Sequence, residues 1–283
     1  MIKFVNAKLN LGLNIVARRA DGYHDLETLF YPVGVYNGTP RNPEPFCDIL
    51  EITPSENTEF IFTGRVVDCP LEKNLVYKAW RLFKENYPDL KEYTIRLEKH
   101  LPDGAGLGGG SADATFALRI LNELSESPFS DSQLAGMALK LGADCPFFVS
   151  NSPCFAQGVG EVMTPSPLNL SGWWALLVKP DVSVSTKEAF AGVTPAIPER
   201  SLIEIAKLPV EEWNGLMIND FEASIFPNHN ILPSIKESLL AMGAVYASLS
   251  GSGSTIFGLF KSREAALKAK ESFDTHYTAL CLL

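Results

Sequence analysis

The segment Leu101-Pro102-Asp103-Gly104-Ala105-Gly106-Leu107-Gly108-Gly109-Gly110-Ser111 carries the strongest structural information in this chain. Five glycines in seven residues cannot form the interior of a stable helix or strand. Glycine lets successive backbone N–H groups turn toward one point, and it lets a ligand approach without a Cβ clash. A helix is predicted next, over Ser111–Glu126, and its first N–H groups and its dipole favour an anion. The segment therefore predicts a phosphate-binding loop.

Other kinds of glycine-rich loop fit less well. Gly104-x-Gly106-x-x-Gly109 matches the dinucleotide fingerprint, but its approach, Glu98–Pro102, is charged and broken by proline instead of forming an apolar strand. No Gly-Lys-Ser/Thr follows, as a P-loop requires, and protein-kinase signatures are absent. A plain turn before a helix stays open as the non-functional interpretation, although the glycine density exceeds what a turn needs.

A second glycine cluster, Leu249-Ser250-Gly251-Ser252-Gly253-Ser254-Thr255, lies far downstream between two predicted strands. By itself this pattern is typical of a hairpin turn. Together with the first loop, it suggests two walls of one polyphosphate site.

Composition and charge limit the class of protein. The chain has 283 residues, 46% of them hydrophobic, and this length favours two domains. A net charge of −9 without a Lys/Arg cluster argues against nucleic acid and anionic membranes as partners. No apolar run is long enough to span a bilayer, and the start of the chain lacks signal-peptide features, so a cytoplasmic location is expected. The five cysteines are scattered, which indicates buried free thiols and argues against a zinc site.

Helices and short strands alternate without a regular βαβ rhythm, which favours an α+β fold. The proline-rich stretch Met163–Gly172 predicts a boundary between domains 1–162 and 163–283, and Tyr36–Pro45 predicts an exposed connection between strands. Strands are predicted at Ile2–Val5, Cys47–Thr53, Glu59–Thr63, Tyr93–Leu97, Trp173–Lys179, Val245–Leu249, Thr255–Phe260 and Tyr277–Leu283. The other predicted helices are Asn74–Tyr87, a helix capped by Ser130 and ending at Gly142, Ser185–Ala191, Pro233–Met242 and Ser262–Phe273.

The two glycine-rich segments resemble the ATP loop and the third motif of the galactokinase, homoserine kinase, mevalonate kinase and phosphomevalonate kinase (GHMP) superfamily. Four further segments resemble the branch that phosphorylates a cytidylated methylerythritol: Ala7–Leu11, Arg19–His24, Gly142–Phe148 and Phe155–Glu161. The matches follow the expected order and cover nearly the whole chain. The sequence departs from the family at Ala112, where a second serine is common, and at Gln157, where an acidic residue is common. The Tyr36–Pro45 stretch looks like a local insertion.

The resemblance implies a two-domain fold. Its N-terminal part is ribosomal-protein-S5-like, its C-terminal part is ferredoxin-like, and the active site lies in the cleft between them. The implied reaction transfers the γ-phosphoryl group of ATP to the 2-hydroxyl of the methylerythritol unit, with Mg²⁺, in the non-mevalonate route to isoprenoid precursors. The partner is thus a small-molecule substrate. The sequence gives neither a confident protein ligand for magnesium nor an oligomeric state.

Lys8 and Asp144 are the catalytic residues that the resemblance implies. Asp144 would orient and deprotonate the acceptor hydroxyl, and Lys8 would stabilise the developing negative charge. From the residues alone, Lys8 could equally be a snorkelling lysine at a strand edge, and Asp144 could be a turn residue after Gly142.

The resemblance also implies two sets of binding residues. For ATP these are Pro102, Asp103, Gly104, Ala105, Gly106, Leu107, Gly108, Gly109, Gly110, Ser111 and Ala112, with Asn74 and Lys99 on the adenosine side. Either of the last two could instead be a helix cap or a solvated charge. For the substrate they are Asn10, Tyr23, His24, Thr186, Phe190, Gly251, Ser252 and Gly253. His24 would hydrogen-bond the cytosine edge, and Tyr23 and Phe190 would stack on the base.

Two other functions stay open at the level of sequence. One is a superfamily kinase acting on homoserine, mevalonate or a sugar, although these substrates carry no nucleobase for Tyr23 and His24 to hold. The other is a non-catalytic relative, against which the presence of both Lys8 and Asp144 argues.

Overall fold

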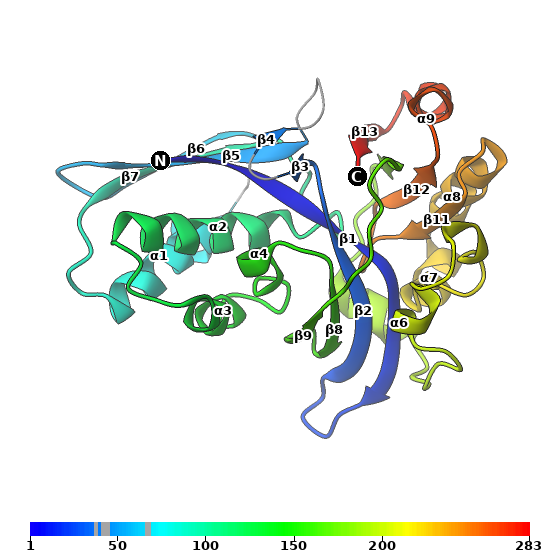
Figure 1. Ribbon diagram of the computed structural model, residues 1–283, viewed down its shortest axis with the longest axis horizontal. Coiled ribbons are helices and arrows are strands. Elements are labelled where there is room, and N and C mark those ends of the chain that lie inside the picture. Colours follow the sequence, from blue (N-terminus) through cyan, green and yellow to red (C-terminus); the bar gives the residue numbers. More distant parts are fainter. Residues whose placement is uncertain (37–38, 41–45, 66–68) are drawn as a thin grey trace. The chain divides into compact units, whose positions relative to one another are not determined.

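The computed structural model describes residues 1–36, 39–40, 46–65 and 69–283, which form two compact units (Figure 1). Unit 1 consists of Met1–Ala7, Val35–Asp103 and Gly108–Ser152. Unit 2 consists of Lys8–Gly34, Gly104–Leu107 and Pro153–Leu283. The units are therefore assembled from alternating chain segments, whereas a single boundary between residues 162 and 163 stays a prediction about the domains.

Unit 1 contains a sheet covered by helices. Its strands are, in spatial order, β6 (Glu59–Gly64), β7 (Tyr93–Lys99), β5 (Cys47–Pro54) and the first residues of β1 (Ile2–Arg18). β5 is antiparallel to both its neighbours, and β6 is parallel to β7. Figure 1 shows α1 (Leu75–Asn86), α2 (Gly109–Leu124), α3 (Asp131–Leu139) and α4 (Phe147–Ser150) together on one face of this sheet.

The helix starts in unit 1 follow from local hydrogen bonding. The Asn74 side chain accepts a hydrogen bond from the Val76 N–H at 2.9 Å and caps α1, as predicted. Ser130 and Gln133 form the predicted capping box of α3, although that helix ends at Leu139, before Gly142. α2 begins two residues earlier than predicted, because Gly108, with φ of 70°, is its N-cap.

The C-terminal part of unit 2 is a four-stranded antiparallel sheet. Its spatial order is β11 (Tyr246–Leu249), β12 (Ile256–Phe260), β10 (Trp174–Lys179) and β13 (Tyr277–Leu282). Numbered along the chain, this order is 2-3-1-4, which is the expected ferredoxin-like arrangement. The helices α8 (Ile231–Ala241) and α9 (Arg263–Lys270) pack on it around a core that includes Leu176, Leu239, Ile256, Phe260 and Ala266. α8 begins at Ile231, two residues before the predicted start, because Pro233 is tolerated in a first helical turn.

The remainder of unit 2 contains strands that the sequence analysis missed. β1 continues to Arg18, far beyond the predicted end at Val5, and is followed by β2 (His24–Val33), β8 (Cys154–Gly158) and β9 (Val162–Pro165). β9 overlaps the start of the Met163–Gly172 stretch, for which the sequence predicts a domain boundary. Three short helices complete the unit: α5 (Thr186–Ala191), α6 (Leu202–Ile205) and α7 (Phe221–Ile225).

Two further predictions concern the loop and the cysteines. The predicted Tyr36–Pro45 connection is described only in part. Its described residues belong to two short antiparallel strands, β3 (Val35–Tyr36) and β4 (Thr39–Pro40). Residues 37–38 and 41–45 lie outside the described residues. All five cysteines are free and four are buried, as predicted, while Cys69 is half-buried. Among the helices of the described residues, none combines the length and apolarity that a membrane span needs.

Candidate active site

Lys8 is a buried residue of β1. Lys8 and Asn10 point to the same face because strand side chains alternate, and each is 2% exposed. The Lys8 Nζ donates hydrogen bonds to the Asn10 Oδ1 at 2.5 Å and to the carbonyl oxygen of Gly106 at 3.0 Å. Asn10 in turn donates to the Thr28 hydroxyl at 2.9 Å. The snorkelling interpretation is therefore wrong: the ammonium is enclosed and contacts the first glycine loop.

The two glycine-rich segments lie against each other in unit 2. A Cβ on Gly106 would stand 1.9 Å from the carbonyl oxygen of Ser250, and Gly106 has a φ of +72°, so no other residue fits there. The Ser250 Oγ donates to the Gly106 carbonyl at 2.9 Å and lies 3.3 Å from the Asn10 backbone nitrogen that donates to it. A Cβ on Gly251 would stand 3.0 Å from Asn10 Oδ1 and 3.4 Å from Lys8 Nζ. Unit 2 thus brings a lysine, an amide and both loops to one place.

The second half of the first loop opens α2 in unit 1. Gly104, Gly106 and Gly108 all have positive φ values, which gives an alternating backbone of the kind that forms anion-binding nests. The 16-residue helix that follows has free N–H groups in its first turn, at Gly109, Gly110 and Ser111, as every helix does. This geometry suits a phosphate group. The neighbouring Ala112 is fully buried, so this position contributes packing.

Lys99 is the centre of a buried charge network in unit 1. It is 3% exposed, and its Nζ lies 2.5 Å from Asp48 Oδ2 and 2.7 Å from Asp113 Oδ2. The other oxygen of Asp48 accepts the backbone N–H groups of His100 and Leu101 at 2.6 and 2.8 Å. The network therefore joins the end of β7 to the first turns of α2, the two elements that flank the glycine loop. Lys99 is not the solvated charge that the sequence left open, and its role toward ATP stays a prediction.

Burial and charge act in opposite directions within this network. Burial raises the pKa of Asp113, and the neighbouring carboxylate of Asp48 raises it further, although Lys99 opposes both effects. Burial also tends to lower the pKa of Lys99, but the two carboxylates outweigh it and the pKa is raised. Lys99 therefore stays positively charged at physiological pH.

Two of the residues predicted to hold the base lie in contact. The rings of His24 and Phe190 are stacked, with centroids 4.8 Å apart and planes inclined by 18°. Phe221 contacts Phe190 edge-on, with ring centroids 4.9 Å apart. Tyr23 is 66% exposed beside His24, and Thr186 is an exposed residue at the start of α5.

The remaining predicted residues are placed by their elements. Asp144 is a half-buried residue of the turn before α4 in unit 1, and Ser252 and Gly253 belong to the same β11–β12 loop as Gly251. Pro102 is buried and Asp103 exposed at the end of unit 1's segment before the loop. Because Lys8 belongs to unit 2 and Asp144 to unit 1, their joint role in catalysis stays a prediction.

Within the residues that the structure describes, no group of three or more His, Cys, Asp or Glu side chains could hold a metal ion. Magnesium in phosphoryl transfer is commonly bound by substrate phosphates with only one or two carboxylates, so this side-chain set is compatible with an ion that arrives with ATP. Burial raises the pKa of Cys145, the residue after Asp144, to about 11. Burial therefore favours the neutral thiol over the thiolate, which is the nucleophilic form.

Several polar residues that contact the predicted site residues or the second glycine loop were not predicted from the sequence: Thr28, Asp48, Asp113, Asn219 and Glu222. The sequence did contain a signal for the part of β1 that was not predicted. Lys8, Asn10 and Asn14 alternate with Leu9, Leu11, Leu13 and Ile15, which indicates a strand with one polar face.

The fold and the glycine loop define an ATP-dependent small-molecule kinase. The chain matches the models of two families, "GHMP kinases N terminal domain" over residues 74–152 and "GHMP kinases C terminal" over residues 193–279. These matches confirm the predicted two-domain fold.

Curated relatives narrow the family. The 4-diphosphocytidyl-2-C-methyl-D-erythritol kinase of Parabacteroides distasonis is 50% identical over 261 residues, 92% of each chain, and that of Bacteroides fragilis is 47% identical over 272 residues, 95% of each chain. A solved structure of 4-(cytidine 5'-diphospho)-2C-methyl-D-erythritol kinase is similar, with a TM-score of 0.79, 30% identity and full coverage of both chains. The chain belongs to the 4-diphosphocytidyl-2-C-methyl-D-erythritol kinase family.

Proposed function

We propose that this kinase transfers the γ-phosphoryl group of ATP to the 2-hydroxyl of 4-diphosphocytidyl-2-C-methyl-D-erythritol. The observation that carries the proposal is the buried Lys8 ammonium, which contacts the Gly106 carbonyl of the ATP loop and the Asn10 amide together. A charge in this position is ready to stabilise the transferring group. The named activity of the relatives supports the choice of acceptor.

In the proposed reaction, the acceptor oxygen forms a bond to the γ-phosphorus while the bond between that phosphorus and the β–γ bridging oxygen breaks, and ADP leaves. The Asp144 carboxylate accepts the proton of the hydroxyl. Lys8 stabilises the negative charge on the attacking oxygen and on the phosphoryl group, and Asn10 hydrogen-bonds the polyol. Mg²⁺, held by the phosphate oxygens, would neutralise charge on the polyphosphate.

Base recognition is assigned to the aromatic group of unit 2. His24 carries ring nitrogens suited to the edge of cytosine, while Phe190 and the exposed Tyr23 offer faces for stacking. Homoserine, mevalonate and sugars present no such base. The net charge of −9 is in keeping with a small-molecule partner and against nucleic acid.

The direct test is an ATP-consumption assay of the full chain with four acceptors: the cytidylated methylerythritol, homoserine, mevalonate and galactose. We expect turnover with the cytidylated alcohol alone, loss of turnover on chelation, and recovery with Mg²⁺. Phosphorus NMR of the product would place the new phosphate on the 2-hydroxyl. Robust phosphorylation of homoserine or mevalonate without reaction of the cytidylated alcohol would refute the proposal.

A further inference from the structure

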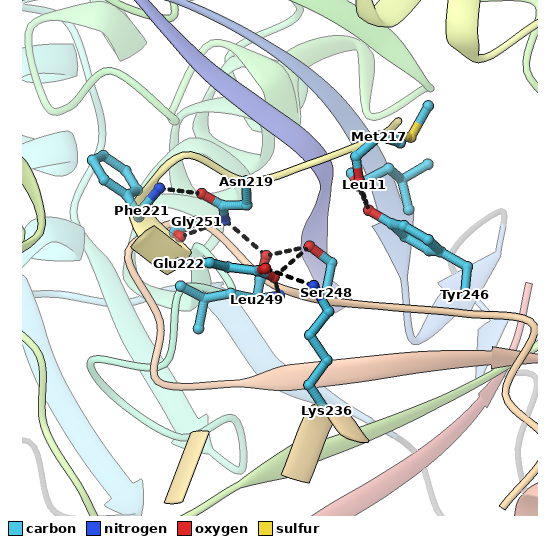
Figure 2. Close-up of polar contacts among 10 residues, drawn as sticks. All are labelled: Leu11, Met217, Asn219, Phe221, Glu222, Lys236, Tyr246, Ser248, Leu249 and Gly251. Atoms are coloured by element: carbon cyan, nitrogen blue, oxygen red, sulfur yellow. Dashed lines mark hydrogen bonds and ion pairs between the residues drawn. The ribbon is translucent and has the colours of Figure 1, made fainter. Parts of the chain in front are cut away.

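The segment before α7 holds the second glycine loop through one amide side chain. Asn219 is 2% exposed, and its Nδ2 donates hydrogen bonds to the carbonyl oxygens of Leu249 at 2.8 Å and Gly251 at 2.9 Å. Its Oδ1 accepts the Phe221 N–H at 3.0 Å. Figure 2 shows the Asn219 side chain between Phe221 on one side and the start of the loop on the other. The Asn219 amide thus donates to two carbonyl oxygens of the backbone, one at the end of β11 and one in the loop.

Asn219 is itself fixed to the strand that carries Lys8. The Leu13 N–H donates to the Ile218 carbonyl at 2.9 Å, and the Asp220 N–H donates to the Leu13 carbonyl at 2.8 Å. The Asp220 carboxylate accepts the Ile15 N–H at 2.7 Å. Residues 218–220 therefore run beside β1 like a short added strand, and Asn219 reaches from it to the loop.

A carboxylate from the same segment secures the loop's entrance. The Glu222 Oε1 accepts the Leu249 N–H at 2.9 Å and the Ser248 hydroxyl at 3.1 Å, and its other oxygen pairs with Lys236 at 2.5 Å (Figure 2). Asn219 and Glu222 together leave the Ser248–Gly251 backbone little freedom.

The loop residues next to the Asn219 hydrogen bonds, Ser250 and Gly251, are the ones that contact the predicted site residues of unit 2. Gly251 lies against the Asn10 oxygen and the Lys8 ammonium, and Ser250 bridges to the Gly106 carbonyl. A shift of this turn would therefore displace both the lysine's hydrogen-bond partners and the backbone of the first loop.

We propose that Asn219 is a positioning residue of this kinase: its amide sets the location of Gly251 and Ser250, and through them the Lys8–Asn10 pair and the Gly106 part of the ATP loop. This proposal rests on the proposed function only for the choice of acceptor. The proposal does not require Asn219 to contact the substrate.

The test compares Asn219→Asp and Asn219→Ser with the wild type. The aspartate keeps the shape but turns an oxygen toward two carbonyl oxygens, and the serine removes the amide without adding charge. The matched control is Asn122→Asp. Asn122, near the end of α2, is also a buried amide and is 7% exposed. Its side chain donates a hydrogen bond to the Phe129 carbonyl and accepts one from the Phe129 N–H.

Three quantities are measured for each variant: the melting temperature, the affinity for a non-hydrolysable ATP analogue by calorimetry, and the single-turnover rate with the cytidylated alcohol. Calorimetry is run well below every melting temperature, where a purely structural role would leave affinity unchanged. We expect both Asn219 variants to lose about 10- to 100-fold in nucleotide affinity and rate, the scale of disrupted buried hydrogen bonds. The Asn122 variant should stay near wild type in both.

Wild-type affinity and rate in a folded Asn219 variant would overturn the proposal. So would failure of both Asn219 variants to fold while the Asn122 variant folds, because Asn219 would then be a folding residue. Nucleotide affinity is measured without an acceptor, so an error in the assigned acceptor would leave this result interpretable.

Discussion

The imidazole of His24 lies stacked on the ring of Phe190, with the centroids 4.8 Å apart. These residues are 166 positions apart in sequence, on β2 and α5, and the contact fixes the orientation of the imidazole edge. We predict that His24→Ala weakens binding of a cytidine fragment by about 10- to 100-fold, because a hydrogen bond to a polar base edge is lost. Phe190→Leu should weaken it less, since it keeps apolar contact but frees the imidazole. Isothermal titration of both variants with the cytidine fragment tests this prediction. An unchanged affinity in His24→Ala would show that His24 has only a structural role.

The contact between the two glycine-rich segments gives a second prediction. Gly106→Ala should abolish nucleotide binding, because its Cβ would meet the Ser250 carbonyl oxygen at 1.9 Å. Gly104→Ala is the matched control: Gly104 also has a positive φ, of +57°, but a Cβ there has nothing within 4 Å. Both variants bear a left-handed strain of about 1–2 kcal/mol, and only the first has a backbone collision. Equal losses of affinity in calorimetry would show that the contact between the loops has no bearing on ATP binding.

Catalysis gives a third prediction. Asp144→Asn keeps the side-chain shape but removes the proposed base, so kcat should fall by about 10²–10⁴-fold with little change in ATP affinity. Lys8→Ala should have an effect of similar size. The double variant should lose much less than the product of the two, because residues that act as a unit are not additive. Single-turnover rates of the three variants test this; near-wild-type chemistry in Asp144→Asn would leave it as a turn residue.

The Lys99 network predicts a large difference between two lysines of unit 1. Lys99→Met leaves the Asp48 and Asp113 carboxyls buried without their cation, and the free energy of unfolding should fall by about 3–5 kcal/mol. Lys3→Met breaks a pair with Glu123 whose side chains are 33% and 38% exposed, and it should cost about 1 kcal/mol or less. Urea unfolding measures both. Similar small losses would mean that the buried charges contribute no net stability through Lys99.

Glu27 gives a prediction for pH dependence. Burial raises its pKa above the ordinary value of 4.5, and the Leu202 N–H only partly opposes this effect. The folded state therefore binds more protons than the unfolded state as pH rises from about 4.5 through the raised folded-state pKa, and the stability contributed at this site is lost over that range. Glu27→Gln should raise the melting temperature at neutral pH, and the gain should vanish near pH 4.

The control for Glu27 has the opposite sign. A hydrogen bond from Thr58, aided by Lys84, lowers the pKa of Glu92, so its ionised form stabilises the folded state. Glu92→Gln should therefore lower the melting temperature at neutral pH. A Glu27→Gln variant that behaved in the same way would contradict the assignment of its pKa to burial.

The sequence by itself determined the features that depend on neighbouring residues. Asn74 and Ser130 cap their helices as their side-chain chemistry requires, and the density of glycine in Gly104–Gly110 predicts a phosphate loop without any knowledge of the fold. The four strands of the C-terminal sheet and the helices α5, α8 and α9 lie close to their predicted positions, whereas α6 and α7 were not predicted. These features need no information about residues far along the chain.

Tertiary structure alone decided which distant groups meet. Lys8 could be exposed or enclosed until the fold placed Gly106 and Asn10 against its ammonium. From its sequence neighbours alone, Lys99 could be an exposed lysine. Long-range packing buries it between the carboxylates of Asp48 and Asp113, which are 51 and 14 residues away. Asn219 gave no pattern at all, because its function depends on carbonyl oxygens 30 and 32 residues further on. Backbone groups have no sequence signature of their own, so the residues that hold the loops in place emerge only from the folded chain.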